Sequence, residues 1–322
     1  MTIHSTISWI NDALATKNLG QGMTYYRVQG GDIRATNGKI TASHPWEFGG
    51  EFLVPGKEFE KVLSRMKDNV TIETDKQTVT LKSGRLRGAI QTLPLTEWDY
   101  PAPDEAKWKK MPKRLIEVLT ALRPFILDDA SQEWAKCVAL QDGWAYATNN
   151  IAVAGAECPG PKAAMLPYWA VDFILGRVDA LAEWAWEEHY VAFRWGNGAW
   201  MRSQLVVGEF QARAGEMVRK ASTEKATQQI DAVFKTAFNQ CAELSEDTVS
   251  IYADRITSGF GKAMVEDAAT CEVPDGSDHS IWGAKFLLPV IAAATSWSPA
   301  SWPKPALFRG PVVSGYVVGR KQ

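Results

Sequence analysis

An internal repeat of about 110 residues constrains this chain more than any other feature of its sequence. The segment 33–42, IRATNGKITA, matches the segment 145–154, AYATNNIAVA, at an offset of 112 positions. Pro55 and Pro167 each follow an apolar residue and open a helix-like pattern, and they stand at the same offset. Two separate landmarks with one spacing indicate a duplicated unit. Its length is that of a small domain and is too long for a solenoid repeat.

A third, weaker copy follows, in which the segment ITSGFGK at 256–262 stands where 33–39 stands in the first copy. Each copy shows the same order of elements: an amphipathic helix, strands, a second short helix and further strands. The first helices are predicted over 5–15, 113–123 and 224–244. The second helices are predicted over 57–67, from 168 to about 177, and from about 284, where Pro289 must lie in the first turn or kink the helix. Strands are predicted at segments such as 70–73, 78–81, 138–140 and 248–252.

The pattern predicts an α+β chain of three tandem domains, each with two helices packed on antiparallel sheets. Polar and basic segments at 101–112 and 211–223 are predicted to be the linkers. The predicted domains are therefore 1–104, 105–212 and 213–322.

Composition and cysteine usage point to a reduced, soluble protein. The apolar share of 46% and the charged share of 22% are ordinary for a globular chain. No apolar run is long enough to span a membrane, and residues 1–17 do not have the pattern of an export signal, so we expect a cytoplasmic protein. The four cysteines, Cys137, Cys158, Cys241 and Cys271, contain no C-x-x-C pair, and we expect buried, reduced thiols rather than disulfides or a zinc site.

No catalytic or cofactor motif is found in the sequence. There is no phosphate-binding glycine loop, no H-E-x-x-H and no G-x-S-x-G. The four histidines have no neighbours at metal-ligand spacing, and the paired carboxylates at 128–129 and 187–188 are typical of turns. We therefore expect no enzymatic activity, no cofactor and no metal.

Five short motifs, in order along the whole chain, resemble the bacterial DNA polymerase III β sliding clamp family. They are TVTLKSGRLRGAIQTLP at 78–94, WDYP at 98–101, ATNN at 147–150, SQLVVGEF at 203–210 and GYVV at 315–318. The third domain matches least well and the chain is shorter than a typical cellular clamp, so a phage-encoded or otherwise divergent member is expected.

The resemblance implies the DNA-clamp domain in three copies and a homodimer in which two subunits join head to tail into a ring. Helices would line the hole and sheets would lie outside. The implied function is that of a non-enzymatic processivity factor, which encircles double-stranded DNA without reading its sequence and tethers a DNA polymerase. A clamp loader would be a further partner, and no membrane would be involved.

Sliding on DNA needs diffuse positive charge rather than base contacts. The candidate DNA-binding residues lie on the predicted helices and linkers: Lys17, Lys57, Arg65, Lys67, Lys113, Arg114, Arg123, Arg219, Lys220, Lys225 and Lys235. Lys17, Lys57 and Arg114 are favoured, because family pore contacts cluster at helix ends. Solvated helix faces are the alternative interpretation of all of them.

The resemblance also implies a partner-peptide groove between the second and third domains. The matching residues are Thr148, Asn150, Val153, Gln211, Val317, Val318 and Gly319. Ile151 and Ala152 replace a His-Arg pair of the family and Gln211 replaces a proline, so we expect a groove with altered specificity, or alternatively a vestigial one. The matching dimer-interface residues are Ile90 and Leu244.

Two other functions stay open. Fourteen tryptophans would suit a carbohydrate-binding or carbohydrate-active β-rich protein if they gathered beside facing carboxylates, although core packing explains scattered tryptophans as well. An enzyme acting on DNA is weakened by the missing metal-binding carboxylate motif. The net charge of −2 gives no overall basic excess, but a ring that is basic inside and acidic outside would hide one.

Overall fold

The computed structural model describes residues 2–17, 20, 22–67, 69–103, 106–161, 163–259, 265–274, 277–300 and 302–321. The chain forms two compact units, Met1–Met111 with Asp172–Leu205, and Pro112–Val171 with Val206–Gln322. Helix α4, Tyr168–Leu175, spans a point at which the chain passes from the second unit to the first. No helix among the described residues is long and apolar enough to cross a membrane.

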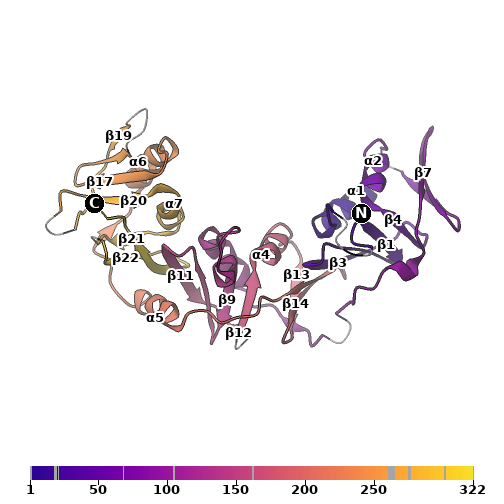
Figure 1. Cartoon of the computed structure of the whole chain (residues 1–322), viewed down its shortest axis with the longest axis horizontal. Coiled ribbons are helices and arrows are strands. Elements are labelled where there is room, and N and C mark those ends of the chain that lie inside the picture. Colours follow the sequence, from indigo (N-terminus) through magenta and orange to yellow (C-terminus); the bar gives the residue numbers. More distant parts are fainter. Residues whose placement is uncertain are drawn as a thin grey trace. The chain divides into compact units, whose positions relative to one another are not determined.

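The first unit contains two α-helices and eleven strands within its described residues (Figure 1). The helices are α1 (Ile3–Ile10) and α2 (Gly56–Leu63), with short 3-10 turns η1 (Asn11–Ala13) and η2 (Leu95–Glu97). The strands are β1 (Tyr25–Gln29), β2 (Asp32–Thr36), β3 (Ile40–Pro45), β4 (Phe52–Pro55), β5 (Thr71–Thr74), β6 (Thr78–Ser83), β7 (Leu86–Gln91), β8 (Lys109–Lys110), β13 (Leu181–Trp186), β14 (Tyr190–Trp195) and β15 (Trp200–Gln204).

The second unit contains four α-helices and twelve strands within its described residues. The helices are α3 (Leu115–Leu122), α5 (Ala212–Ala221), α6 (Ala232–Glu243) and α7 (Ala284–Ala293), with η3 (Arg123–Phe125) and η4 (Glu133–Lys136). The strands are β9 (Cys137–Gln141), β10 (Trp144–Thr148), β11 (Ala152–Glu157), β12 (Ala163–Pro167), β16 (Gln228–Gln229), β17 (Thr248–Tyr252), β18 (Arg255–Ser258), β19 (Glu266–Ala268), β20 (His279–Gly283), β21 (Ser296–Ser298), β22 (Pro305–Arg309) and β23 (Ser314–Val318).

The repeat seen in the sequence is present in the strand order. The first unit has an eight-stranded antiparallel sheet, sheet A, in the order β4-β1-β2-β3-β15-β14-β13-β8. The second has an equivalent sheet, sheet C, in the order β12-β9-β10-β11-β23-β22-β21-β16. In each, four strands of one repeat pair with four strands of the next, through β3 and β15 or through β11 and β23. These shared sheets explain why the compact units do not coincide with the predicted domains, whose boundaries stay a prediction.

Two smaller sheets are left with open edges. Sheet B in the first unit has the order β5-β6-β7, and sheet D in the second has the order β19-β18-β17-β20. Sheet D corresponds to the first four strands of a repeat and sheet B to the closing strands of one. Sheets A and C each join the first strands of one repeat to the closing strands of the next. Among the described residues of their own units, sheet D has no closing strands beside it and sheet B has no first strands beside it.

The matched turns of the repeat have the same chemistry. Asn37 Oδ1 accepts hydrogen bonds from Lys39 N and Ile40 N at 3.0 and 2.9 Å. In the second copy, Asn149 Oδ1 accepts from the backbone N–H groups of residues 151 and 152 at 3.1 and 2.7 Å. The next residue has a positive φ in both turns, 82° at Gly38 and 71° at Asn150, a conformation that glycine and asparagine tolerate best. The sequence match therefore records a conserved turn geometry within one chain.

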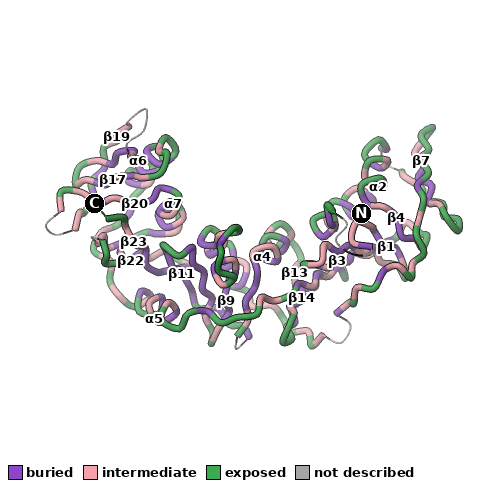
Figure 2. The backbone as a smooth tube through the Cα atoms, in the orientation of Figure 1, coloured by how far each residue is buried: buried purple, intermediate pink, exposed green. Residues whose placement is uncertain are grey.

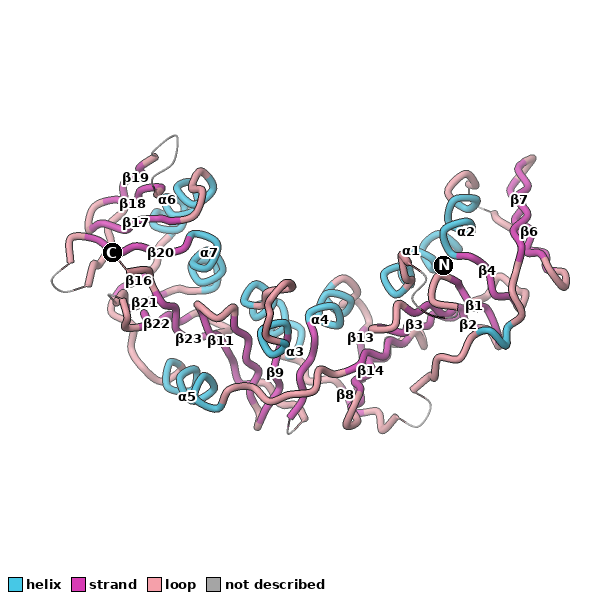
Figure 3. Tube along the Cα trace, in the orientation of Figure 1, coloured by secondary structure: helices cyan, strands magenta, loops and turns pink. Residues whose placement is uncertain are grey.

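Sheet C is covered on both faces. Strand β11 is buried along most of its length (Figure 2), which fits its all-apolar stretch rather than an alternating pattern. Figure 3 shows α5 on one face of this sheet and α3 and α7 on the other. On the α5 face, Tyr146, Val153 and Tyr316 pack with Val218 of the helix. On the opposite face, Phe308 stacks on Phe125 with 5.7 Å between ring centroids.

Two sequence predictions about helices are wrong. The segment 211–223 was expected to be a linker, but it contains α5, whose Val218 and Ala221 are buried against sheet C. The helix expected over 224–244 begins only at Ala232, because Asp231 caps it by accepting a hydrogen bond from Phe234 N. The upstream residues pair as β16 instead. Pro289 lies inside α7.

All four cysteines are free and buried, as the sequence predicted. Burial raises the pKa of Cys137 and of Cys271 to about 12, and that of Cys158 to about 11. At pH 8 the reactive thiolate is therefore a minute fraction of each. We expect no cysteine of the native protein to react with a disulfide reagent such as DTNB within minutes, and all four to react in denaturant. Rapid labelling of any native thiol would contradict this.

Candidate partner groove and charged surfaces

A cavity of about 380 Å³ lies between the N-terminal half of α5 and the middle of sheet C, where the start of β11 pairs with the end of β23. Five of the seven predicted groove residues line it: Thr148, Asn150, Val153, Gln211 and Val318. They come from the turn between β10 and β11, from the residue before α5, and from the end of β23. The structure thus brings together residues from three distant segments of the sequence.

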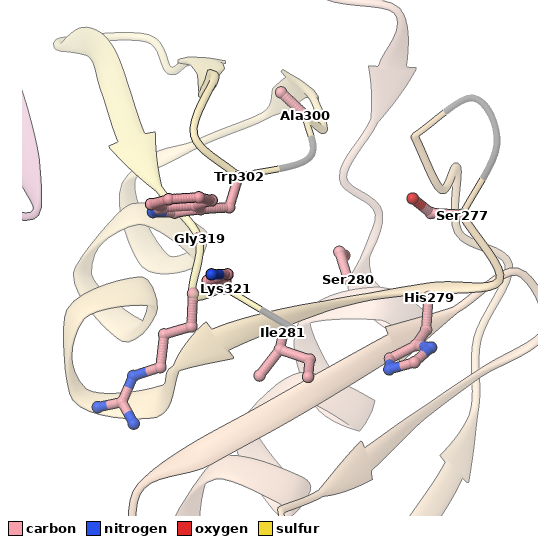
Figure 4. A pocket seen from close by; sticks show the side chains of 9 residues that line it. Ser277, His279, Ser280, Ile281, Ala300, Trp302, Gly319 and Lys321 are labelled. Atoms are coloured by element: carbon pink, nitrogen blue, oxygen red, sulfur yellow. The ribbon is translucent and has the colours of Figure 1, made fainter.

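The other two predicted residues lie elsewhere. Val317 is 1% exposed and pairs with Ala152 and Ala306, so its side chain is on the face of sheet C opposite α5. Gly319 lines a separate cavity of about 210 Å³ at the edge of sheet D. Figure 4 shows Trp302 on one side of that cavity and His279 of β20 on another.

Several lining residues were missed from the sequence. They are Trp134, Phe210, Ala214, Met217, Pro305 and Tyr316, whereas Ile151 and Ala152, which the sequence indicated as departures from the family pattern, do line the cavity. The spacing of Ala214, Met217 and Val218 is a helical stripe that could have revealed α5 and its inward face. Trp134 offers no comparable signal, because it lies in η4, far from the other lining segments in sequence.

Hydrogen bonds between α5 and sheet C hold the groove wall in place. Arg219 donates to the Tyr146 hydroxyl at 2.7 Å, and the Tyr316 hydroxyl donates to the Glu224 carboxylate. Arg309 donates to the backbone oxygens of Ser222 and Glu224, both at 2.8 Å. Burial raises the pKa of Tyr146 and of Tyr316, so both hydroxyls stay protonated at neutral pH. The wall of the groove is therefore a fixed element.

The lining of the groove is that of a binding pocket. Its floor is apolar and aromatic, through Val153, Tyr316 and Phe210, and its rim is polar and uncharged, through Thr148, Asn150 and Gln211. Such a pocket accepts one or two apolar side chains of an extended peptide and orients its backbone with the rim. No group of three His, Cys, Asp or Glu that could hold a metal occurs among the residues that the structure describes.

The predicted DNA-binding residues of the first unit lie near α2. Lys57 is exposed in the first turn of α2, and its Nζ donates to Thr16 O at 3.1 Å, next to Lys17. Arg65 and Lys67 follow the helix and are exposed. Lys17 and Lys57 therefore come from two adjacent segments, whereas Arg65 and Lys67 lie beyond the other end of α2.

In the second unit the predicted residues divide between two faces of sheet C. On the α3 side, Lys113 is exposed, Arg114 is 3.7 Å from Glu117, and Arg123 is 2.9 Å from Asp128. Lys235 of α6 donates to Ala292 O of α7 at 3.4 Å. On the opposite side, Arg219 and Lys220 belong to α5, and Lys225 follows it. The residues on α5 therefore come from a different face of sheet C than α3, although Ser222 and Thr223, just after α5, line one cavity with Arg114.

The two predicted interface residues differ in exposure. Ile90 of β7 is 7% exposed and lines a groove of about 550 Å³ between α2 and β7, with Val62, Leu86 and Gly88. Leu244, at the C-terminal end of α6, is 60% exposed. The structure thus offers an open apolar groove in the first unit and a protruding leucine in the second.

The tryptophans do not form an exposed cluster. Of the fourteen tryptophans, only Trp302 has an exposed side chain, and the other thirteen are buried or half-buried. Trp282 and Trp297, for example, are fully buried in the second unit, with ring centroids 5.7 Å apart. Core packing therefore accounts for most of them, and the carbohydrate-binding alternative loses its main support.

The repeated antiparallel sheets and their helices are similar to the fold of solved bacterial β sliding clamps. Three solved structures have this fold over nearly their whole length. The β sliding clamp of C. crescentus has a TM-score of 0.81 at 14% identity, with 100% of this chain and 97% of that chain covered. The sliding clamp of Pseudomonas aeruginosa bound to griselimycin has a TM-score of 0.80 at 13% identity, with 100% and 97% covered.

The third is the Helicobacter pylori β clamp, solved with a DNA ligase peptide, with a TM-score of 0.78 at 14% identity and 99% and 98% covered. No protein-family model and no curated protein matches the sequence. The fold expected from the sequence motifs is therefore confirmed by structure, at a sequence identity low enough to leave the fold as the shared property.

Proposed function

We propose that this protein is a DNA sliding clamp, a non-enzymatic processivity factor that encircles duplex DNA and tethers a replicative DNA polymerase. The observation that carries the proposal is the incomplete pair of sheets B and D in a chain that otherwise has the clamp fold from end to end. The proposed site of action is the cytoplasm, and a phage origin would account for the divergence.

The strand order itself suggests how two copies would join. In sheets A and C, the third strand of one repeat pairs with the last strand of the next, as β3 pairs with β15 and β11 with β23. By the same rule β19, the open edge of sheet D, would pair with β7, the open edge of sheet B, in a second copy. Because both ends of the chain are open in this way, head-to-tail pairing of two copies closes a ring. Leu244 and the groove beside Ile90 would lie at this junction.

Positive charge on the helix side would face the DNA. We assign this role to Lys17, Lys57, Arg65, Lys67, Lys113, Arg114, Arg123 and Lys235. Arg219, Lys220 and Lys225 are left out, because α5, which carries the first two and precedes the third, lies on the other face of sheet C. Phosphate contacts from such residues give affinity without sequence preference, which a sliding protein requires.

The groove beside α5 is the proposed site for peptides of the polymerase and the clamp loader. The H. pylori clamp of the same fold was solved with a DNA ligase peptide, which makes peptide binding a property to test here. The rim formed by Asn150, Ile151 and Gln211 differs from the family pattern. We propose that this groove serves a dedicated polymerase.

Reversing three charges tests the DNA surface. Changing Lys17, Lys57 and Arg114 together to Glu should weaken duplex binding at low salt equally for unrelated sequences. Loss of three phosphate contacts should also reduce the slope of log K against log salt by about 2.7. Fluorescence anisotropy with two unrelated duplexes over a salt series measures both quantities.

The matched control reverses three charges on and after α5: Arg213, Lys220 and Lys225. It alters net charge by the same amount and should leave the salt slope nearly unchanged. Equal loss in the two variants would contradict the helix-side assignment. Loss on only one of the two duplex sequences would contradict a sliding clamp altogether.

A further inference from the structure

The outer face of sheet A has a chemistry that a duplex-encircling function does not use. One face of this sheet packs under α1, where Trp9 meets His44 and Trp195 at ring-centroid distances of 5.2 and 5.0 Å. The other face, reached by the alternate residues, has half-buried arginines and aromatic rings. We refer to it as the outer face of sheet A.

Strand pairing aligns these side chains into one row across seven adjacent strands. Each member is the direct cross-strand partner of the next: Arg27, Arg34, Ser43, Trp200, Arg194, Glu183 and Lys110. At about 4.8 Å between strands, the row is roughly 29 Å long. A row of this length is suited to an extended ligand that crosses the strands.

Positive charge exceeds negative charge on this face. Its strand residues include five cations, Arg27, Arg34, Arg194, Arg202 and Lys110, and two carboxylates, Asp32 and Glu183. The chain as a whole has a net charge of −2, so this face is more positive than the protein as a whole. The face is therefore complementary to a polyanion.

The two arginines at one end of the row share a single carboxylate: Arg34 lies 3.2 Å from Asp32, and Arg27 donates to the uncharged side chain of Gln29. Arg27 and Arg34 are direct cross-strand partners, and like charges in that position are destabilising. Proximity to Arg34 contributes, with burial, to lowering the pKa of Arg27. The Nε atoms of both arginines and the Oγ of Ser43 are buried without a hydrogen-bond partner among the described residues. An anion over this end of the row would relieve the repulsion.

Aromatic rings alternate with the cations. The Arg34 guanidinium lies 5.3 Å from the ring centroid of Trp200, and that of Arg194 lies 4.5 Å from the ring of Trp108. Arg202 lies 4.2 Å from the ring of Tyr190. Aromatic platforms beside backbone-neutralising cations are what single-stranded nucleic acid needs, because its bases stack and its phosphates pair.

The equivalent face of sheet C shows that this chemistry is specific to sheet A. At the repeat offset, Arg34 corresponds to Tyr146 and Thr41 to Val153, two residues that pack under α5. Thr41 pairs with Arg202, whereas Val153 pairs with Tyr316. One copy of the fold thus has an apolar floor under a helix, and the other has cations at the same positions.

We propose that the outer face of sheet A binds single-stranded nucleic acid along the row from Arg27 to Lys110. The phosphates would pair with the arginines and the bases would stack against the exposed parts of Trp200, Trp108 and Tyr190. This surface adds to the proposed clamp function and does not depend on ring closure, because every residue of the row belongs to one unit.

The test measures binding of the full chain to labelled oligothymidine of about 15 nucleotides, within the range of single-strand site sizes. The double variant Arg27→Gln/Arg34→Gln should bind at least tenfold more weakly, with a salt slope shallower by about 1.4 because two phosphate contacts are lost. Arg27→Lys/Arg34→Lys keeps the charges and should keep the slope, while thermal unfolding by circular dichroism checks that each variant is folded. An unchanged affinity in the folded glutamine variant would overturn the proposal.

Two further arms separate the possible ligands. Trp200→Leu should weaken oligothymidine binding but not the binding of an abasic oligomer of equal length, since only the first can stack. Labelled oligothymidine is also displaced with unlabelled oligothymidine and with poly-glutamate at the same concentration of negative charge. If poly-glutamate competed equally well, an acidic polypeptide would be the better ligand and the proposal would be wrong. The Lys17/Lys57/Arg114 variant should keep single-strand binding, so failure of this proposal is distinguishable from failure of the clamp function.

Discussion

Replacing Leu244 with Glu is expected to convert the proposed head-to-tail dimer into folded monomers. Leu244 is 60% exposed at the end of α6, so a charge there costs little in the isolated chain. At an apolar junction with the groove beside β7, the same charge would be desolvated without a partner. Loss of such a central anchor weakens an interface by about 2 kcal/mol or more, which is roughly thirtyfold in the dimer dissociation constant. Sedimentation velocity over a concentration series measures the shift.

Exposure of the two junction residues determines which substitution tests assembly without destabilising the fold. Ile90 is only 7% exposed within its own unit and is therefore buried. A charge at that position would destabilise the packing of β7 on α2 and obscure the effect on assembly. Val233→Glu is the matched control, because Val233 is 61% exposed and lies on the same helix, in its first turn and at the end away from Leu244. A dimer that survives Leu244→Glu, or a wild-type chain that is monomeric at micromolar concentration, would refute the junction.

The repeat was readable from the sequence because its turns are chemically demanding. Asn37 and Asn149 each accept two backbone hydrogen bonds, and the following residue needs a positive φ. These requirements restrict the residues that can occupy the turn, so the two copies remain similar in sequence. Pairing between repeats was not readable, because nothing local in β3 specifies β15 as its neighbour rather than another open edge.

Helix α5 was missed for a physical reason that applies more widely. Its exposed side carries Arg213, Glu216 and Lys220, and its buried stripe is made of small or flexible residues. The average composition of 211–223 is therefore that of a linker, although its spacing is that of a helix. Periodicity and not polarity would have identified it, and with it the wall of the groove.

The groove residues illustrate the limit of transferring positions from a family. Val317 and Val318 were both assigned to the groove, but neighbouring residues of a strand point to opposite faces. Val318 lines the cavity, and Val317 packs on the other side of sheet C. The alternation rule alone would have excluded one of the two. The contribution of Trp134 depends on tertiary packing and could come only from the structure.

Placing charges in the groove should abolish stimulation of the polymerase while leaving the ring intact. Val153 is an unsuitable position, because it is 8% exposed and packs in the core under α5. Met217 and Val318 are half-buried and line the cavity from α5 and from β23, so Met217→Glu/Val318→Asp alters the pocket with less damage to the core. Two carboxylates in a pocket for apolar anchors should cost about 2 to 4 kcal/mol of peptide binding, or roughly thirty- to a thousandfold in affinity.

The measurement is the length of DNA made per binding event by the cognate polymerase, with sedimentation velocity to establish that the double variant is still a dimer. Val207→Asp is the matched control, because Val207 is 89% exposed on the segment that leads to α5 and does not line the cavity. It should support synthesis as well as the unmodified protein does. If the double variant gave full processive synthesis while the dimer persisted, the polymerase would have to bind this protein at another surface, and the groove beside α5 would lose its proposed role.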